Sequence, residues 1–147
     1  MDRRDVSVAL ALALLAAAAY AAFGAGAHPI QDHHGRLAAA FLEGRWWLAE
    51  APPWLVDLVS CGEGRACAVF PPLPAVLAAP LVPLVGEPFG QALVAQVLGG
   101  ASAGLLYLAV RALGAPRPVA FAGAVLSAFG TTLFFSSVDA RAPYVGH

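Results

Sequence analysis

The chain has 147 residues, of which 60% are hydrophobic and only 12% are charged, and its mean hydropathy is +0.74. So few polar side chains cannot cover a water-soluble globule of this size, and a membrane protein is predicted. The formal net charge is -1 and every basic residue is arginine, with no basic run interleaved with aromatic residues. This composition argues against a nucleic-acid partner.

The first predicted membrane span covers residues 6–27, which carry no charge. As a helix this run would be about 33 Å long, enough to cross the hydrocarbon core. Arg3 and Arg4 lie in the preceding segment, residues 1–5, and the positive-inside rule places them in the cytoplasm. A cleaved signal peptide is the alternative, because Ala25-Gly26-Ala27 fits a small-x-small cleavage site. Both interpretations place the following residues outside the cytoplasm.

Residues 28–88 are predicted to form an extracytoplasmic loop, since their first two thirds are rich in charges and contain all three tryptophans. Within the loop, residues 36–47 have the pattern of a short amphipathic helix lying on the bilayer surface. The tryptophans suit the headgroup zone and ordinary packing under a loop about equally well. The side chains that we expect to face the lipid are Leu37, Ala40, Phe41 and Trp47.

The second half of the loop holds a predicted hairpin and a proline-rich segment. Two short β-prone pieces flank the glycine-rich stretch between Cys61 and Cys67, which predicts a β-hairpin over residues 57–70. In an oxidising compartment the two cysteines are expected to form a disulfide. Residues 71–86 are apolar but contain five prolines, which favours an interfacial or re-entrant helix over a full span.

Two more spans are predicted, at residues 89–110 and 118–138, joined by a link at residues 111–117. The link contains two arginines and is therefore placed in the cytoplasm. Gly100-x-x-x-Gly104 in the second span indicates a close-packing face, a pattern common in membrane helices. Residues 139–147 would again be extracytoplasmic, and their lack of a polar tail suggests the truncated end of a longer protein.

The predicted fold class is therefore an all-α membrane protein with about three transmembrane helices, interfacial helices in the external loop and a small β-hairpin. The predicted location is the cell membrane, multi-pass, with the N-terminus in the cytoplasm. Ionisable residues are absent from residues 6–27 and 89–110, which argues against a transporter or channel fragment.

Polar groups that can carry chemistry gather just after the first span. Asp32, His33 and His34, followed by Arg36, could supply a general base, metal ligands or a phosphate-facing site. The alternative is the solvated start of a loop. Adjacent histidines point in different directions, so no metal site is predicted. No nucleophile triad order, phosphate-cradling glycine loop or zinc-protease motif is present in the sequence.

Several phrases resemble the start of membrane glycosyltransferases of the GT-C type, which are mannosyltransferase-like and use polyprenyl-phosphate sugars. The resemblance covers nearly the whole chain, beginning with the external Asp32 after a first span. The phrases are Leu-Ala-Ala-Ala-Phe-Leu-Glu-Gly-Arg-Trp-Trp-Leu at 37–48, Phe-Pro-Pro-Leu-Pro-Ala at 70–75, Phe-Gly-Thr-Thr at 129–132, and the external Asp139.

This resemblance implies that Asp32 acts as the base toward an acceptor while a lipid-phosphate-linked sugar enters from the bilayer. It also implies substrate-binding roles for His33, His34, Arg36 and Asp139. The expected partners are membrane lipid, a polyprenyl-phosphate sugar donor and an unidentified acceptor, with no cofactor beyond the donor. Because such enzymes have many more spans, the chain alone is expected to be an inactive N-terminal segment. The rival prediction is a small non-enzymatic membrane protein whose external loop binds a partner.

Overall fold

The fold is described from a computed structural model, in which residues 2–24 and 32–139 are described. Helices dominate these residues, and the only sheet among them has two strands. The chain divides into two compact units. The helical unit contains residues 1–25 and 95–138, and the loop unit contains residues 26–94 and 139–147. The suggested cleavage site at 25–27 and most of the predicted end segment lie outside the described residues.

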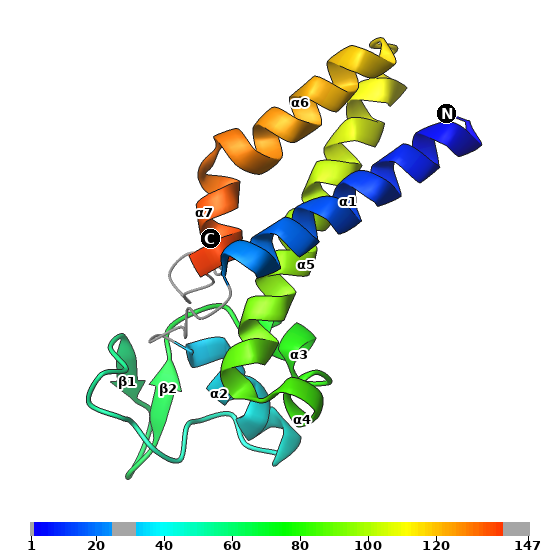
Figure 1. The fold of residues 1–147 in the computed structure, drawn as a ribbon. Helices are drawn as coiled ribbons and strands as arrows, with labels where there is room; N and C mark the ends of the chain where they lie inside the picture. The colour runs from blue at the N-terminus through cyan, green and yellow to red at the C-terminus, as the bar shows by residue number, and fades with distance from the viewer. Residues whose placement is uncertain (1, 25–31, 140–147) are drawn as a thin grey trace. The chain divides into compact units, whose positions relative to one another are not determined.

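The helical unit is built from α1 (Arg3–Phe23), most of α5 (Glu87–Ala112), α6 (Arg117–Gly130) and α7 (Thr132–Asp139) (Figure 1). Two helices are long and apolar enough to cross a membrane: α1, and α5 from Phe89 onward. These coincide with the first two predicted spans. Membrane association is therefore indicated by length and composition.

The predicted third span is not one straight helix. Between α6 and α7 the axis bends by 52°. Thr131 lies at the break with φ -127° and ψ 177°, an extended conformation that interrupts the helical hydrogen bonds. The pair has the combined length and hydropathy of a broken span or of a re-entrant loop. A third crossing at residues 118–138 stays a prediction.

Two glycines allow α5 to approach α1 closely. A Cβ atom at Gly100 would lie 2.4 Å from the carbonyl oxygen of Ala13, and one at Gly104 would lie 2.6 Å from that of Ala9. Real side chains do not make such contacts, so only glycine fits at either position. The Gly100-x-x-x-Gly104 pattern therefore forms the close-packing face against α1, as small residues do between membrane helices.

One end of the helical unit is held by a buried carboxylate. Asp5 is 1% exposed and accepts hydrogen bonds from Tyr107 Oη at 3.2 Å, Arg111 Nε at 3.1 Å and Arg117 Nε at 3.0 Å. It also forms a capping box with Asp2 at the start of α1. These contacts bring the first turn of α1 together with the last turns of α5 and the start of α6.

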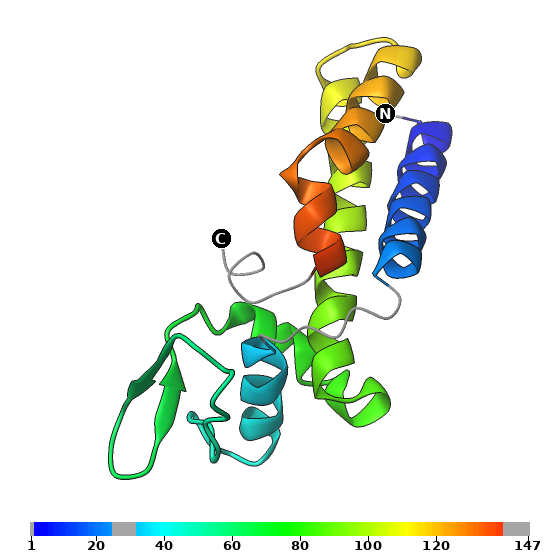
Figure 2. The ribbon, with the colours of Figure 1, turned by 60° about the vertical axis from the view of Figure 1, so that its left-hand side comes forward.

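The loop unit contains α2 (His33–Leu42), the strands β1 (Leu58–Ser60) and β2 (Ala66–Ala68), α3 (Leu73–Ala78), α4 (Val82–Val85) and the start of α5. α2 packs against α3 (Figure 2). The core consists of Leu37, Ala38, Leu48, Leu55, Ala75, Ala78 and Val94.

The strands form the predicted antiparallel hairpin, with Val59 opposite Cys67. In the structure Cys61 and Cys67 form a disulfide that closes it. The predicted interfacial segment at 71–86 becomes α3 and α4, whose 6 and 4 residues correspond to helices only about 9 and 6 Å long. Neither helix can cross a bilayer.

The prediction for the amphipathic helix was wrong in its bounds and in the surface that covers it. α2 starts at His33 and ends at Leu42, because Gly44 adopts φ 73° and forms a Schellman cap. In that cap the Arg45 N–H donates to the Ala40 carbonyl. Leu37 is only 4% exposed because it packs inside the loop unit's own core, not against lipid.

Candidate functional site

Asp32 is positioned by the first turn of α2. It occupies the N-cap position, but its carboxylate makes no capping hydrogen bond. Instead Asp32 Oδ1 accepts from Arg36 Nε at 2.8 Å, one turn along the same helix. Asp32 is 4% exposed, whereas the Arg36 side chain is 27% exposed. The result is a buried carboxylate attached to an arginine that reaches toward the surface.

Gln91 caps α2 in place of Asp32. Its Oε1 atom accepts from the backbone N–H of His34 at 2.9 Å and from that of Gly35 at 3.2 Å. The first N–H groups of a helix need such acceptors when they are buried. Because Gln91 supplies the acceptor from α5, the Asp32 carboxylate is free to bond Arg36.

Gly35 makes this arrangement possible. A Cβ atom at this position would lie 2.1 Å from the carbonyl oxygen of Glu87. The start of α5 therefore contacts the backbone of α2 directly. Sequence reasoning did not select Gly35, Glu87 or Gln91, and a glycine in a polar stretch or an amide in a predicted span gives little signal.

His33 and His34 are fully buried beside Asp32. His33 Nε2 lies 2.5 Å from the carbonyl oxygen of Val56, and both rings meet the ring of Phe70 edge-on. Neither nitrogen of the His34 ring has a hydrogen-bond partner among the described residues. Burial, together with the charge of His33, lowers the pKa of His34 to about 4, so its ring is uncharged at neutral pH.

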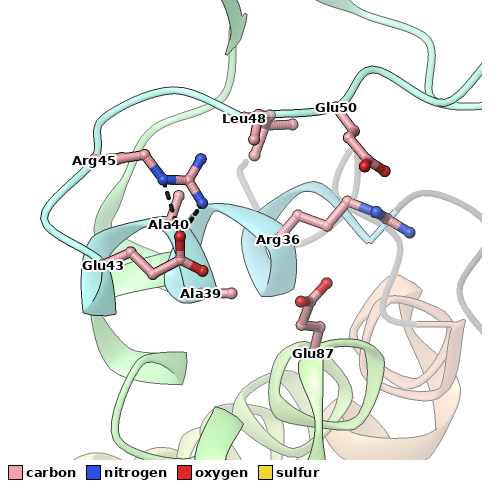
Figure 3. A pocket seen from close by; sticks show the side chains of 9 residues that line it. Arg36, Ala39, Ala40, Glu43, Arg45, Leu48, Glu50 and Glu87 are labelled. Carbon is pink, nitrogen blue, oxygen red and sulfur yellow. Dashed lines mark hydrogen bonds and ion pairs between the residues drawn. The ribbon is translucent and has the colours of Figure 1, made fainter.

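A pocket of about 300 Å³ opens beside Arg36 (Figure 3). Its wall carries three carboxylates and two guanidinium groups. Arg45 is paired with Glu43, and the Arg36 side chain extends between those of Glu50 and Glu87. The lining residues are Arg36, Ala39, Ala40, Glu43, Arg45, Leu48, Ala49, Glu50 and Glu87.

Of the predicted site residues, only Arg36 lines this pocket, and Asp32 reaches it through Arg36. His33 and His34 are fully buried and do not line the pocket. Asp139 is the last residue of α7 and does not belong to the pocket wall. Sequence reasoning missed Glu50 and Glu87, since residues so far apart in the sequence give no sign that they share a pocket.

Within residues 2–24 and 32–139 no group of three or more His, Cys, Asp or Glu side chains is arranged to hold a metal ion.

No protein-family model matches the chain, and neither the search of curated proteins nor that of solved structures gave a match.

Proposed function

We propose that the chain is the N-terminal segment of a GT-C-type membrane glycosyltransferase. It would transfer a sugar from a polyprenyl-phosphate-linked donor to an extracytoplasmic acceptor. The observation that carries the proposal is the Asp32–Arg36 pair, which joins a buried carboxylate to a polar pocket. The pocket lies in a unit whose chain continues directly into the candidate span of α5.

In the proposed mechanism Asp32 is the general base. The acceptor hydroxyl loses its proton to Asp32 while its oxygen attacks the anomeric carbon, and the bond from that carbon to the phosphate oxygen breaks. The lipid phosphate leaves with the bonding electron pair, and the sugar is transferred with inversion. A positioned base of this kind typically contributes about 10²–10⁴-fold to the rate.

Arg36 would hold Asp32 in place and face the substrate. Its Nε atom bonds Asp32, while its two terminal nitrogens make no hydrogen bond within the described part of the chain. They can donate to the donor or the acceptor from the pocket side. The buried His33 and His34 would keep the first turn of α2 in position.

The proposed topology is multi-pass, with a cytoplasmic N-terminus and three crossings. Asp5 forms ion pairs with Arg111 and Arg117. The start of α1, the end of α5 and the start of α6 therefore lie at the same side of the helical unit. Arg3 and Arg4 lie in the first turn of α1 and favour the cytoplasm for that side. The loop unit, which follows α1 and precedes α5, would then be extracytoplasmic.

The test is Asp32→Asn in the complete protein, assayed with a polyprenyl-phosphate sugar and membrane acceptors. Loss of the base should lower transfer by about 10²-fold or more, with expression and membrane insertion unchanged. Glu63→Gln, at the exposed hairpin tip, is the matched control and should keep full activity. Wild-type transfer by the Asp32→Asn protein would remove Asp32 from the mechanism.

A second candidate function is a non-enzymatic membrane protein with a partner-binding external loop. Trp46 and Trp54 favour it, since they are 79% and 57% exposed in the loop unit and tryptophan is enriched among residues that dominate binding energy. Under this alternative, alanine at both positions should abolish function while Asp32→Asn leaves it intact. The proposed transferase predicts the larger loss for Asp32→Asn.

A further inference from the structure

The pocket beside Arg36 has an unusual balance of charge. Both guanidinium groups of the pocket already form ion pairs, Arg45 with Glu43 and Arg36 with Asp32. Glu50 and Glu87 also line the wall, and neither side chain forms an ion pair or hydrogen bond within residues 2–24 and 32–139. Among the described residues, the pocket groups without a hydrogen-bond partner are thus the carboxylates of Glu50 and Glu87, the terminal nitrogens of Arg36 and the Oε1 atom of Glu43.

These side chains make the pocket unfavourable for binding an anion. A phosphate in the pocket would meet Arg36 but would also lie beside the carboxylates of Glu50 and Glu87, and like charges close together are costly. A simple ammonium group fits poorly for the opposite reason. It would be drawn to the two glutamates but placed next to the guanidinium group that extends between them (Figure 3).

A neutral group with many hydroxyls uses both kinds of side chain. Each hydroxyl can donate to a carboxylate oxygen and accept from a guanidinium N–H, and bonds to charged partners are the stronger ones. The pocket volume of about 300 Å³ is at the lower end of the range for small-molecule sites. That size suits a single sugar ring better than an oligosaccharide or a lipid tail.

We propose that this pocket binds the sugar ring of a substrate through Glu50, Glu87 and Arg36, and that the lipid phosphate binds elsewhere. The inference rests on the proposed function and specifies it, since it separates the sugar part of the substrates from the phosphate part. Glu50 and Glu87 are the specificity-determining residues, because their carboxylates accept the sugar hydroxyls.

The experiment uses the full 147-residue chain in phosphatidylcholine nanodiscs. Saturation-transfer difference NMR is recorded with methyl glycosides of mannose, glucose and galactose, and with ethylammonium. Inorganic phosphate is followed by ³¹P line broadening. At least one glycoside should bind saturably, and phosphate and ethylammonium should not.

The Glu50→Gln/Glu87→Gln protein should bind that glycoside at least about tenfold more weakly, since two charged acceptors are lost. Neither side chain makes an internal bond among the described residues, so the variant should fold normally. Glu63→Gln, which lies outside the pocket, should bind as the wild type does.

The inference is overturned if no glycoside binds, if phosphate or ethylammonium binds instead, or if the double variant binds unchanged. These results are separable from failure of the proposed function. Sugar binding without any transfer by the complete protein would refute the transferase and keep the sugar site. Asp32-dependent transfer without glycoside binding in this pocket would do the reverse.

Discussion

Each unit buries one aspartate near the start of a helix, and the two aspartates differ in the number of hydrogen bonds that their carboxylates accept. In the helical unit Asp5 receives hydrogen bonds from a tyrosine and two arginines, and it joins three helices. In the loop unit Asp32 receives one arginine side chain and does not cap its helix, a task that Gln91 performs. Asp5 is thus surrounded by donors, whereas Asp32 has one side-chain donor among the described residues, Arg36, which lines the pocket.

The same contrast extends to the close contacts. In the helical unit Gly100 and Gly104 bring two apolar helices together along their length. In the loop unit Gly35 brings α2 against the start of α5, and that contact places Glu87 in the pocket wall. Close packing therefore joins two long helices in one unit and positions a residue of the pocket wall in the other.

The largest loss of stability is expected when the close packing of α5 against α1 is disrupted. Gly100→Leu forces a side chain into the backbone of α1, which cannot move aside as a flexible side chain could, and should destabilise the helical unit by about 3 kcal/mol or more. Thermal unfolding in detergent micelles measures the change. Gly123→Leu is the control, because nothing lies within 4 Å of a Cβ at that position. Equal unfolding temperatures for the two variants would contradict the close α1–α5 packing.

The second prediction concerns the pH dependence of the stability of the loop unit. The folded His34 has a pKa of about 4, against 6.5 for an ordinary histidine. As the pH falls from about 6.5 to 4, His34 becomes protonated in the unfolded chain but stays neutral in the folded chain. The free energy of unfolding of the loop unit should therefore decrease by up to about 3 kcal/mol. Hydrogen exchange of the α2 amides reports it. His34→Phe should flatten this pH dependence, and an unchanged slope would show that His34 is not its source.

The smallest effect is local to the hairpin. Cys61→Ser with Cys67→Ser opens a short loop and should cost about 2 kcal/mol, confined to β1 and β2. Hydrogen exchange should accelerate there and stay unchanged in α2. Before reduction, the wild-type cysteines should resist thiol labelling in membranes from an oxidising compartment. Free labelling of both would argue against an extracytoplasmic loop.

Local patterns predicted the local features well. Uncharged runs marked α1 and α5, and a glycine-rich stretch between two cysteines marked the hairpin. Asp32 and Arg36 are four residues apart, so their pairing on one helical turn is also a local property. These features depend on spacing alone, which the sequence displays directly.

Non-local features escaped prediction. The spacing of apolar residues in α2 indicates an apolar face but does not determine whether lipid or α3 covers that face. In the structure Leu37 packs in the protein's own core. Likewise, the sequence predicts that Glu87 lies at the end of the external loop and Gln91 near the start of a membrane span. Only the folded chain shows that Gln91 caps α2 and that Glu87 lines the pocket.

The most direct test of the central contrast compares Asp5→Asn with Asp32→Asn in the complete protein, measuring transfer per folded molecule and thermal stability together. Asp5→Asn should lower stability while the molecules that fold keep their transfer rate. Asp32→Asn should keep stability and lose about 10²-fold or more in transfer. If instead Asp32→Asn is as active as the wild type, or if both variants lose only stability, then Asp32 is a structural residue and the proposed mechanism is wrong.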